Sequence, residues 1–328
     1  MVKKALLKTI YNLGGFAPFH WTTRDKVLIL TYHRFSRAED PDKISSRAFA
    51  AHLEYLSKNS RVLSLDETID LCRNGKSLPP NTTVITIDDG YADAFEIAFP
   101  LLKKFKMPAT VYAVTDFLDE KCWLWTDLMR YVLLETMSGG LRIEFGADVF
   151  ESDLTNETNR FELAGRINSR LKKMPDAEKK AKIDQIAASL NVEIPAAPVR
   201  EFAPMSWAQA REMDHENVRI ESHTKTHPIL TNVSAADLEF ELKTSKKRLE
   251  EVLERRVEHF CYPNGSFDEK VERAVENAGY KSAVTTDYGF NQNLSNRFAL
   301  RRINAQSGIA SFAQSASGFE ALRQKITS

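Results

Sequence analysis

Short runs of β-branched and other apolar residues alternate along the chain with segments of helical periodicity. The clearest runs are VLILTY (27–32), VITI (84–87), TVYAV (110–114), VRIE (218–221), HFCY (259–262) and SAVT (282–285), with RVLSL (61–65) as a weaker candidate. Most runs are continuous rather than alternating, which is typical of strands covered on both faces. Strands that alternate with helices predict a parallel sheet and an α/β fold.

The segments between these runs carry helix start and stop signals. Ser64 and Ser206 each stand three residues before a Glu or Gln, which is the spacing of a capping box. Gly75 and Gly279 stand where helix C-caps belong. YADAFEIAFPLLKKF (91–105) has the periodicity of a helix that follows the second strand directly.

Two regions depart from this rhythm. Between about residues 119 and 200 no strong strand pattern occurs and two charged helices are expected, so we predict a helical insertion that is either a lid or groove wall or a plain subdomain. Residues 1–24 form a separate N-terminal helical segment, and residues 25–328 form the main domain. The N-terminal segment has lysines beside Leu6, Leu7 and Ile10, so it either packs on the domain or contacts a membrane surface.

Polar side chains follow almost every predicted strand at the point where it ends. They include His33 after the first run, Asp88 and Asp89 after the second, and His223 and His227 after the fourth. In an α/β barrel the carboxyl ends of all strands lie on one face, where catalytic groups collect. The pattern therefore predicts an active-site rim.

Composition and charge exclude some partners. The 328 residues contain 45 Lys and Arg and 45 Asp and Glu, so the net charge of zero gives no electrostatic case for nucleic acid. Three widely spaced cysteines provide no disulfide framework. The N-terminus has no convincing export signal, so we expect a cytoplasmic location, including the inner face of a membrane.

Two histidines four residues apart suggest a metal site. ESHTKTHP places His223 and His227 in one bend, since Pro228 makes a long helix unfavourable there. Two imidazoles and one carboxylate bind Zn²⁺ and leave one position open for water.

The paired aspartates can reach such a site together only if the backbone turns, which Gly90 permits. One carboxylate could then bind the metal and the other take a proton from the water. The alternative is that Asp88 or Asp89 simply caps the helix that follows.

These motifs together resemble the polysaccharide deacetylase family, also called the NodB-homology or carbohydrate esterase 4 group. TIDDG (86–90) resembles the family's T-F-D-D-G, HTKTH (223–227) matches its H-[ST]-x-x-H, and YPNG (262–265) resembles a variant of R-x-P-Y-G. The resemblance spans about residues 25–305, apart from the insertion. It implies a distorted (β/α) barrel whose enzymes remove N-acetyl groups from amino sugars.

Position by position, the resemblance implies a role for each motif residue. Asp88 would be the general base and a metal-bound water the nucleophile. Asp89, His223 and His227 would hold a divalent metal, Zn²⁺ first and otherwise Co²⁺, Ni²⁺ or Mn²⁺. The expected substrate is an N-acetylated polysaccharide, oligosaccharide or glycolipid precursor. Residues near the third motif would bind it, and the full set of expected substrate residues is Tyr262, Pro263, Asn264 and Arg302.

The chain also departs from the family pattern. Cys261 stands where the family has the arginine that holds the base, and Arg302 or Arg301 could supply that charge instead. The family's Leu-x-His, which provides the general acid, has no histidine here in ALRRIN (299–304). We therefore expect His33 to be the acid or else a structural histidine. The alternatives for function are a non-catalytic glycan-binding protein, or an O-acetyl esterase or amidase on the same barrel.

Overall fold

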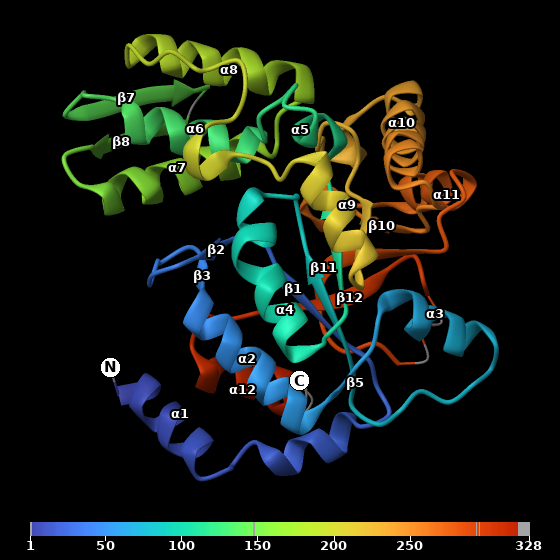
Figure 1. The fold of residues 1–328 in the computed structure, drawn as a ribbon. Coiled ribbons are helices and arrows are strands. Elements are labelled where there is room, and N and C mark those ends of the chain that lie inside the picture. Colours follow the sequence, from blue (N-terminus) through green and yellow to red (C-terminus); the bar gives the residue numbers. More distant parts are fainter. Residues whose placement is uncertain (1, 147, 293, 295, 321–328) are drawn as a thin grey trace.

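Parallel strands close into a barrel in the computed structural model, which describes residues 2–146, 148–292, 294 and 296–320 (Figure 1). The hydrogen-bonded order is β1-β12-β11-β10-β9-β6-β5, and β5 returns to β1, so seven strands form a closed ring. The strands are β1 Leu28–Tyr32, β5 Thr82–Ile87, β6 Ala109–Ala113, β9 Val218–Ser222, β10 His259–Cys261, β11 Ser282–Tyr288 and β12 Leu300–Asn304. A short strand, β4 Arg61–Val62, extends the sheet beside β5. The predicted (β/α) barrel is confirmed.

The strands are buried on both sides, as their continuous apolar runs predict. All five residues of β1 and all six of β5 are buried. Helices cover the outside of the ring and are seen around it in Figure 1. They are α2 Ser46–Asn59, α3 Leu65–Arg73, α4 Phe99–Phe105, α9 Trp207–His215, α10 Ala235–Leu253, α11 Glu269–Asn277 and α12 Ile309–Ala316. Ser64 and Ser206 cap α3 and α9 as expected, the second through a full capping box.

One barrel strand was not foreseen from the sequence. β12 carries Arg301 and Arg302, so its pattern does not read as a buried strand. Leu300 and Ile303 nevertheless lie in the barrel core, while Arg302 is buried because it has a charged partner inside the barrel. This strand closes the ring by pairing with both β11 and β1.

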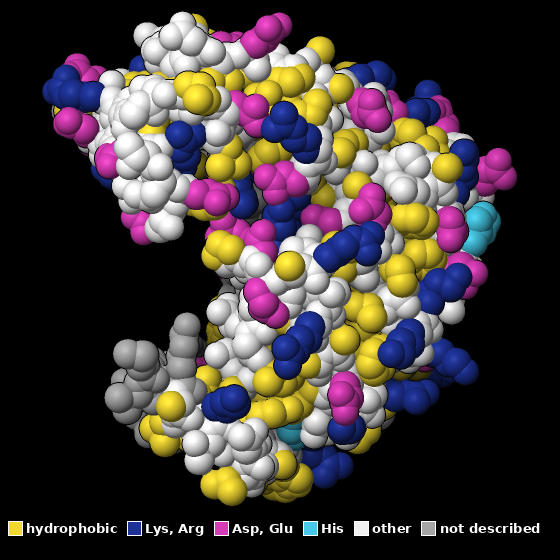
Figure 2. Space-filling view, turned by 60° about the vertical axis from the view of Figure 1, so that its left-hand side comes forward, with side chains coloured by type: hydrophobic (Ala, Val, Ile, Leu, Met, Phe, Trp, Pro, Cys, Tyr) yellow, Lys and Arg dark blue, Asp and Glu magenta, His cyan; other side chains and the backbone are white. Residues whose placement is uncertain are grey.

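The insertion, expected to be largely helical over about residues 119–200, also contains a pair of strands that were not foreseen from the sequence. An antiparallel hairpin of β7 Gly140–Phe145 and β8 Asp148–Asp153 stands beside α6 Trp125–Glu135, α7 Glu157–Leu171 and α8 Asp176–Ser189. The alternation in LRIEF was the available signal, because Leu141 and Phe145 are buried and Arg142 and Glu144 point outward. The insertion has a hydrophobic core of its own. Figure 2 shows it overhanging a broad notch in the outline of the molecule.

The N-terminal segment contains α1 Val2–Asn12 and a 3₁₀ turn, Ala17–Thr23. Leu7, Ile10 and Tyr11 pack against the main core, whereas Leu6 and Leu13 are exposed. Among the described residues, no helix combines the length and the apolar character that crossing a bilayer requires.

A buried histidine under this segment predicts acid sensitivity. His52 of α2 is fully buried, stacks on Phe312 at 3.9 Å between ring centroids, and meets the Tyr32 hydroxyl at 3.3 Å. Burial lowers the pKa of His52 from 6.5 to about 4. His52 therefore binds a proton in the unfolded chain but not in the folded chain, and stability falls as the pH drops below about 6.5.

Between pH 7 and pH 5, we expect the native protein to lose about 2 kcal/mol more stability than the His52→Gln variant loses. Glutamine cannot titrate and can still accept the Tyr32 hydrogen bond. Denaturant unfolding at the two pH values measures the difference, and the exposed His215 replaced by Gln is the matched control. Equal acid losses in the native and His52→Gln proteins would contradict the prediction.

Candidate active site and metal centre

The expected rim residues meet at the carboxyl ends of the barrel strands. His33 follows β1, Asp88 and Asp89 follow β5, and His223 follows β9. Hydrogen bonds run between these strand ends, including Asp88 N to Tyr32 O (2.9 Å) and His223 N to Ala113 O (3.0 Å). The barrel therefore brings together residues that lie far apart in the sequence.

The backbone turns sharply between the two aspartates, so their carboxylates meet different partners. Asp89 and Gly90 have φ of 76° and 92°, in the left-handed region. A Cβ at Gly90 would lie 2.8 Å from Leu118 Cδ1, so a larger residue would strain the turn. Among the described residues, no backbone N–H of the following helical segment, which begins at Ala92, donates to either carboxylate. This argues against the capping role considered from the sequence.

Asp89, His223 and His227 form a compact set of metal donors. The Nε2 atoms of His223 and His227 lie 3.5 and 3.6 Å from Asp89 Oδ1, and one ligand atom from each residue lies within 4.8 Å of the others. Donors bound at about 2.1 Å around a tetrahedral ion are separated by about 3.4 Å. The set therefore fits a divalent ion such as Zn²⁺ without rearrangement.

The surroundings prepare both imidazoles to act as ligands. His223 Nδ1 donates to the Cys261 carbonyl at 2.7 Å, which turns Nε2 toward Asp89. Burial and the neighbouring His223 lower the pKa of His227 to about 3, so its ring is neutral at physiological pH. Thr224 and His227 have φ of 72° and 63°, and the Thr224 hydroxyl accepts from His227 N at 3.0 Å. The bend expected for HTKTH therefore exists.

Asp88 is held by a buried arginine. Arg302 Nη1 and Nη2 donate to its two carboxylate oxygens, both at 2.7 Å. The remaining guanidinium donors reach Thr285 O (2.7 Å) and Thr86 Oγ1 (3.1 Å), so the fork is fixed from several sides. Burial alone would raise the pKa of Asp88, but the charge and hydrogen bonds of Arg302 lower it below its ordinary value. The carboxylate is thus ionised and oriented.

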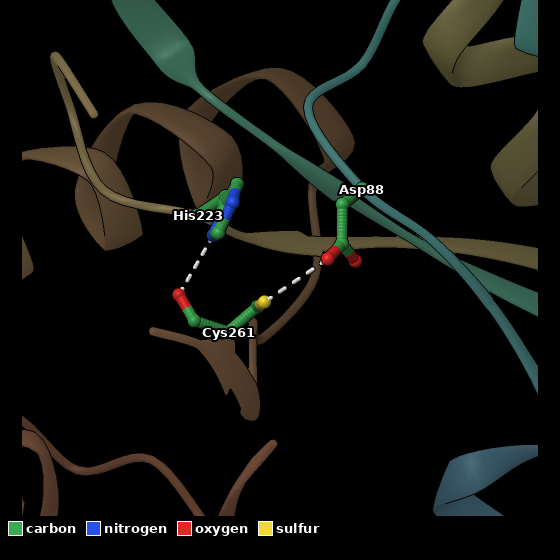
Figure 3. A group of neighbouring side chains, drawn as sticks. All are labelled: Asp88, His223 and Cys261. Carbon is green, nitrogen blue, oxygen red and sulfur yellow. Dashed lines mark hydrogen bonds between the residues drawn. The ribbon is translucent and has the colours of Figure 1, made fainter. Parts of the chain in front are cut away.

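Cys261 lies beside Asp88 and His223, as Figure 3 shows. Its Sγ lies 3.6 Å from Asp88 Oδ2 and 3.2 Å from Arg302 Nη2. A small side chain at this point of β10 leaves room for the arginine to enter from β12. Because its carbonyl also accepts from His223, one residue of β10 contacts both Asp88 and His223.

His33 stands at the open side of the same carboxylate. Its Nε2 lies 3.6 Å from Asp88 Oδ2, and its side chain is 45% exposed while that of Asp88 is 3% exposed. The imidazole therefore lies between the buried Asp88 carboxylate and the solvent.

Three of the four residues expected to bind substrate are buried, and their contact with substrate stays a prediction. Arg302 is buried and fully engaged with Asp88. Tyr262 is buried as well, with its hydroxyl donating to Phe298 O at 3.0 Å. Pro263 is also buried, and Asn264 is exposed with φ of 58°. Of this set, Asn264 is the residue presented to solvent.

One polar network beside the site was not foreseen. Asp127 of the insertion helix α6 accepts from the Tyr91 hydroxyl at 2.6 Å, and Arg34 lies 3.9 Å over the Tyr91 ring while it binds Asp93 at 2.8 Å. Burial raises the pKa of Asp127 to about 6. In the sequence Asp127 reads only as an acidic residue in a first helical turn, so no local signal marked it. The network fastens the insertion to the rim.

Comparisons with known proteins agree with this geometry. A family model described as polysaccharide deacetylase matches residues 75–283. A Bacillus subtilis protein that is provisionally named a polysaccharide deacetylase is 22% identical over 289 residues, which are 88% of this chain and 74% of that protein. A Staphylococcus aureus poly-β-1,6-N-acetyl-D-glucosamine N-deacetylase is 27% identical over 113 residues, which are 30% of this chain and 39% of that enzyme.

Solved structures share the fold. The Streptococcus pyogenes deacetylase PplD, in complex with acetate, superposes with a TM-score of 0.59 at 18% identity and covers 92% of this chain and 98% of its own. IcaB from Ammonifex degensii gives a TM-score of 0.57 at 17% identity, over 88% of this chain and 97% of its own.

Proposed function

The chain belongs to the polysaccharide deacetylase family, and from that premise we propose that it removes N-acetyl groups from amino sugars of a glycan by metal-dependent hydrolysis. The observation that carries the proposal is the pairing of a buried, arginine-held Asp88 with the adjacent Asp89, His223 and His227. A non-catalytic glycan binder would have no use for an ionised carboxylate buried next to a complete donor set.

Each residue then has a task in the reaction. Asp89, His223 and His227 would hold the divalent ion, which supplies Lewis-acid polarisation of the acetyl carbonyl and a lowered pKa for water. Asp88 takes the proton from the attacking water, because Arg302 keeps it ionised and aimed at the rim. The backbone N–H of Asn264 would help to stabilise the oxyanion.

The leaving amine needs a proton, and His33 is the group we propose as its donor. It is exposed to the substrate side and lies within 3.6 Å of Asp88. Acid and base would then lie side by side at the same small site.

Replacing His33 should therefore slow leaving-group departure. We expect His33→Ala to lower kcat by about 10²-fold or more and to remove the alkaline limb of the pH–rate profile. Stopped acetate-release assays across pH measure both. A profile with the native alkaline limb would remove His33 from the acid role, whatever the change in rate.

Replacing Arg302 should misplace the base without touching the substrate. Arg302→Ala leaves the Asp88 carboxylate buried without its partner, so the pKa of Asp88 rises and the acid limb of kcat/KM moves to higher pH. We expect a loss of about 10²-fold near neutral pH. Adding Cys261→Arg to that variant should restore part of the activity, because the new side chain starts beside Asp88. No rescue, together with an unshifted acid limb, would contradict this role for Arg302.

Acetate release tests the function as a whole. The purified protein, loaded with Zn²⁺ or Co²⁺, is offered β-1,6-linked N-acetylglucosamine oligomers and, in parallel, an O-acetylated xylan. We expect acetate from the N-acetyl substrates and loss of that activity after chelation. Release from the O-acetyl substrate alone would identify an esterase, and binding without release from either would identify a glycan-binding protein.

A further inference from the structure

A buried glutamate on α10 lies against the HTKTH loop, residues 223–227. Glu241 is 6% exposed and shares the inward face of α10 with Leu238, Leu242 and Leu249. An apolar residue would be expected at this position of the helix, because a carboxylate that is buried without partners is costly. The glutamate therefore needs partners that satisfy its carboxylate.

Those partners are three hydrogen-bond donors of the HTKTH loop. Oε2 of Glu241 accepts from the backbone N–H groups of Lys225 at 2.8 Å and Thr226 at 2.9 Å. Oε1 accepts from the Thr226 hydroxyl at 2.6 Å. Successive backbone N–H groups that point at one oxygen form an anion-binding concavity. One carboxylate thus holds two adjacent peptide units of the loop.

Residues just after β6 hold the carbonyl side of the same loop. Thr115 N donates to Thr224 O at 3.2 Å, and Asp116 N donates to Lys225 O at 2.9 Å. These two donors are backbone groups, which almost any residue supplies. The Glu241 carboxylate is a side chain, so a substitution can remove its contribution.

The geometry of the loop explains why it needs this support. Thr224 and His227 have φ of 72° and 63°, a region that is unfavourable for residues with a Cβ. The buried Nδ1 of His227 has no hydrogen-bond partner among the described residues, whereas Nδ1 of His223 donates to Cys261 O. The orientation of the His227 ring therefore depends on the backbone of the loop.

We propose that Glu241 is a positioning residue of the metal site, because its carboxylate holds the HTKTH loop in the bend that turns His227 toward Asp89. The proposal rests on the proposed function, in which Asp89, His223 and His227 bind the metal. Outer partners that orient metal ligands typically contribute about 10–100-fold to metal affinity. Glu241 would act in this way through the backbone rather than through an imidazole nitrogen.

Two substitutions of Glu241 separate its hydrogen bonds from its charge. Glu241→Gln keeps the contacts, because the amide oxygen can accept from both N–H groups while the Thr226 hydroxyl turns to accept from the amide NH₂. Glu241→Leu fills similar space on the apolar face of α10 and leaves the loop N–H groups without their acceptor.

Glu250 provides the matched control on the same helix. It lies about 13 Å further along α10 and accepts from Val257 N at 3.0 Å. Glu250→Leu therefore removes a hydrogen bond of the same kind, from a glutamate to a backbone N–H, at a place away from the HTKTH loop.

The measured quantity is the affinity for Zn²⁺, obtained by competition with a chromophoric chelator. We expect Glu241→Leu to weaken Zn²⁺ binding by about tenfold or more, and Glu241→Gln and Glu250→Leu to stay within about threefold of the native protein. An affinity within about threefold of native in Glu241→Leu would overturn the inference. Equal losses in Glu241→Gln and Glu241→Leu would also overturn it, because the hydrogen bonds would then not be the cause.

If Glu241→Leu does not fold, Thr226→Val decides, since it removes one of the three hydrogen bonds and no charge. A loss of Zn²⁺ affinity of about threefold or more supports the inference, and native affinity overturns it. Acetate release is measured separately on the same proteins. The expected affinities in a protein that releases no acetate would refute the proposed function alone, and unchanged affinities in an active enzyme would refute the role of Glu241 alone.

Discussion

Asp88→Asn is expected to lower kcat by about 10³-fold while the protein keeps its bound metal. The amide cannot accept the proton of the attacking water, but the donors Asp89, His223 and His227 are untouched. Acetate release and metal analysis of the same preparation measure the two effects. Near-native turnover by this variant would refute Asp88 as the base, and loss of the metal would assign Asp88 to the donor set.

The same substitution carries a cost in stability that has to be separated from catalysis. Removing one partner of a buried ion pair costs about 3–5 kcal/mol, because the other charge remains buried. Arg302 would be that charge, since its side chain is 1% exposed. The double variant Asp88→Asn/Arg302→Met removes both charges and should recover part of the stability but none of the turnover.

Asp70, exposed on α3, provides the matched control for the aspartate substitution. Asp70→Asn changes the same chemical group far from the barrel rim and should leave turnover and stability within error of the native protein. If it lowers turnover as much as Asp88→Asn, the loss reflects handling or general charge rather than a general base.

His223→Ala should abolish activity by a different route, through loss of the metal. It removes one of three protein donors, and removing even an outer partner of a metal ligand weakens metal binding by about 10–100-fold. We expect the affinity for Zn²⁺ to fall by more than about 100-fold. Competition with a chromophoric chelator measures it directly.

His215→Ala, at an exposed position on α9, controls for the loss of an imidazole.

We expect the two test variants to differ in metal content and to agree in turnover. Asp88→Asn keeps the metal and His223→Ala loses it, while both lose activity. A His223→Ala protein with native Zn²⁺ affinity would show that the metal lies elsewhere, and the mechanism would have to be rebuilt around another donor set.

The barrel and its rim could be largely predicted from the sequence because their signals are local. Most buried strands are marked by a continuous apolar run, and His33, Asp88 and His223 each stand directly after a strand. β12 escaped prediction because Arg301 and Arg302 break its apolar pattern. The reason for a buried arginine lies across the barrel at Asp88, outside any local window. The β7–β8 hairpin is different. Its alternation of apolar and polar residues is present in the sequence, but the many charged residues around it favoured the interpretation as helices.

The finer parts of the site depend on packing, which the sequence does not display. Motif position suggested that Tyr262 would face the substrate, yet its ring lies flat on Phe267 with centroids 4.9 Å apart. Asp127 and Tyr91 are 36 residues apart and meet only because the insertion docks on the rim. Spacing in a motif indicates which residues gather at a site, and tertiary packing decides which of them face outward.

Because Arg302 comes from the last barrel strand, its pairing with Asp88 also has to form late in folding. Arg302 lies 214 residues after Asp88, and the strand that carries it closes the ring against β1. During synthesis or refolding, Asp88 must wait for that late segment, because burying the carboxylate alone is costly. Contacts between such distant segments are among the slowest to form. Recovery of enzymatic activity should therefore mark the final closing of the ring and lag behind the appearance of helices and of the other strands.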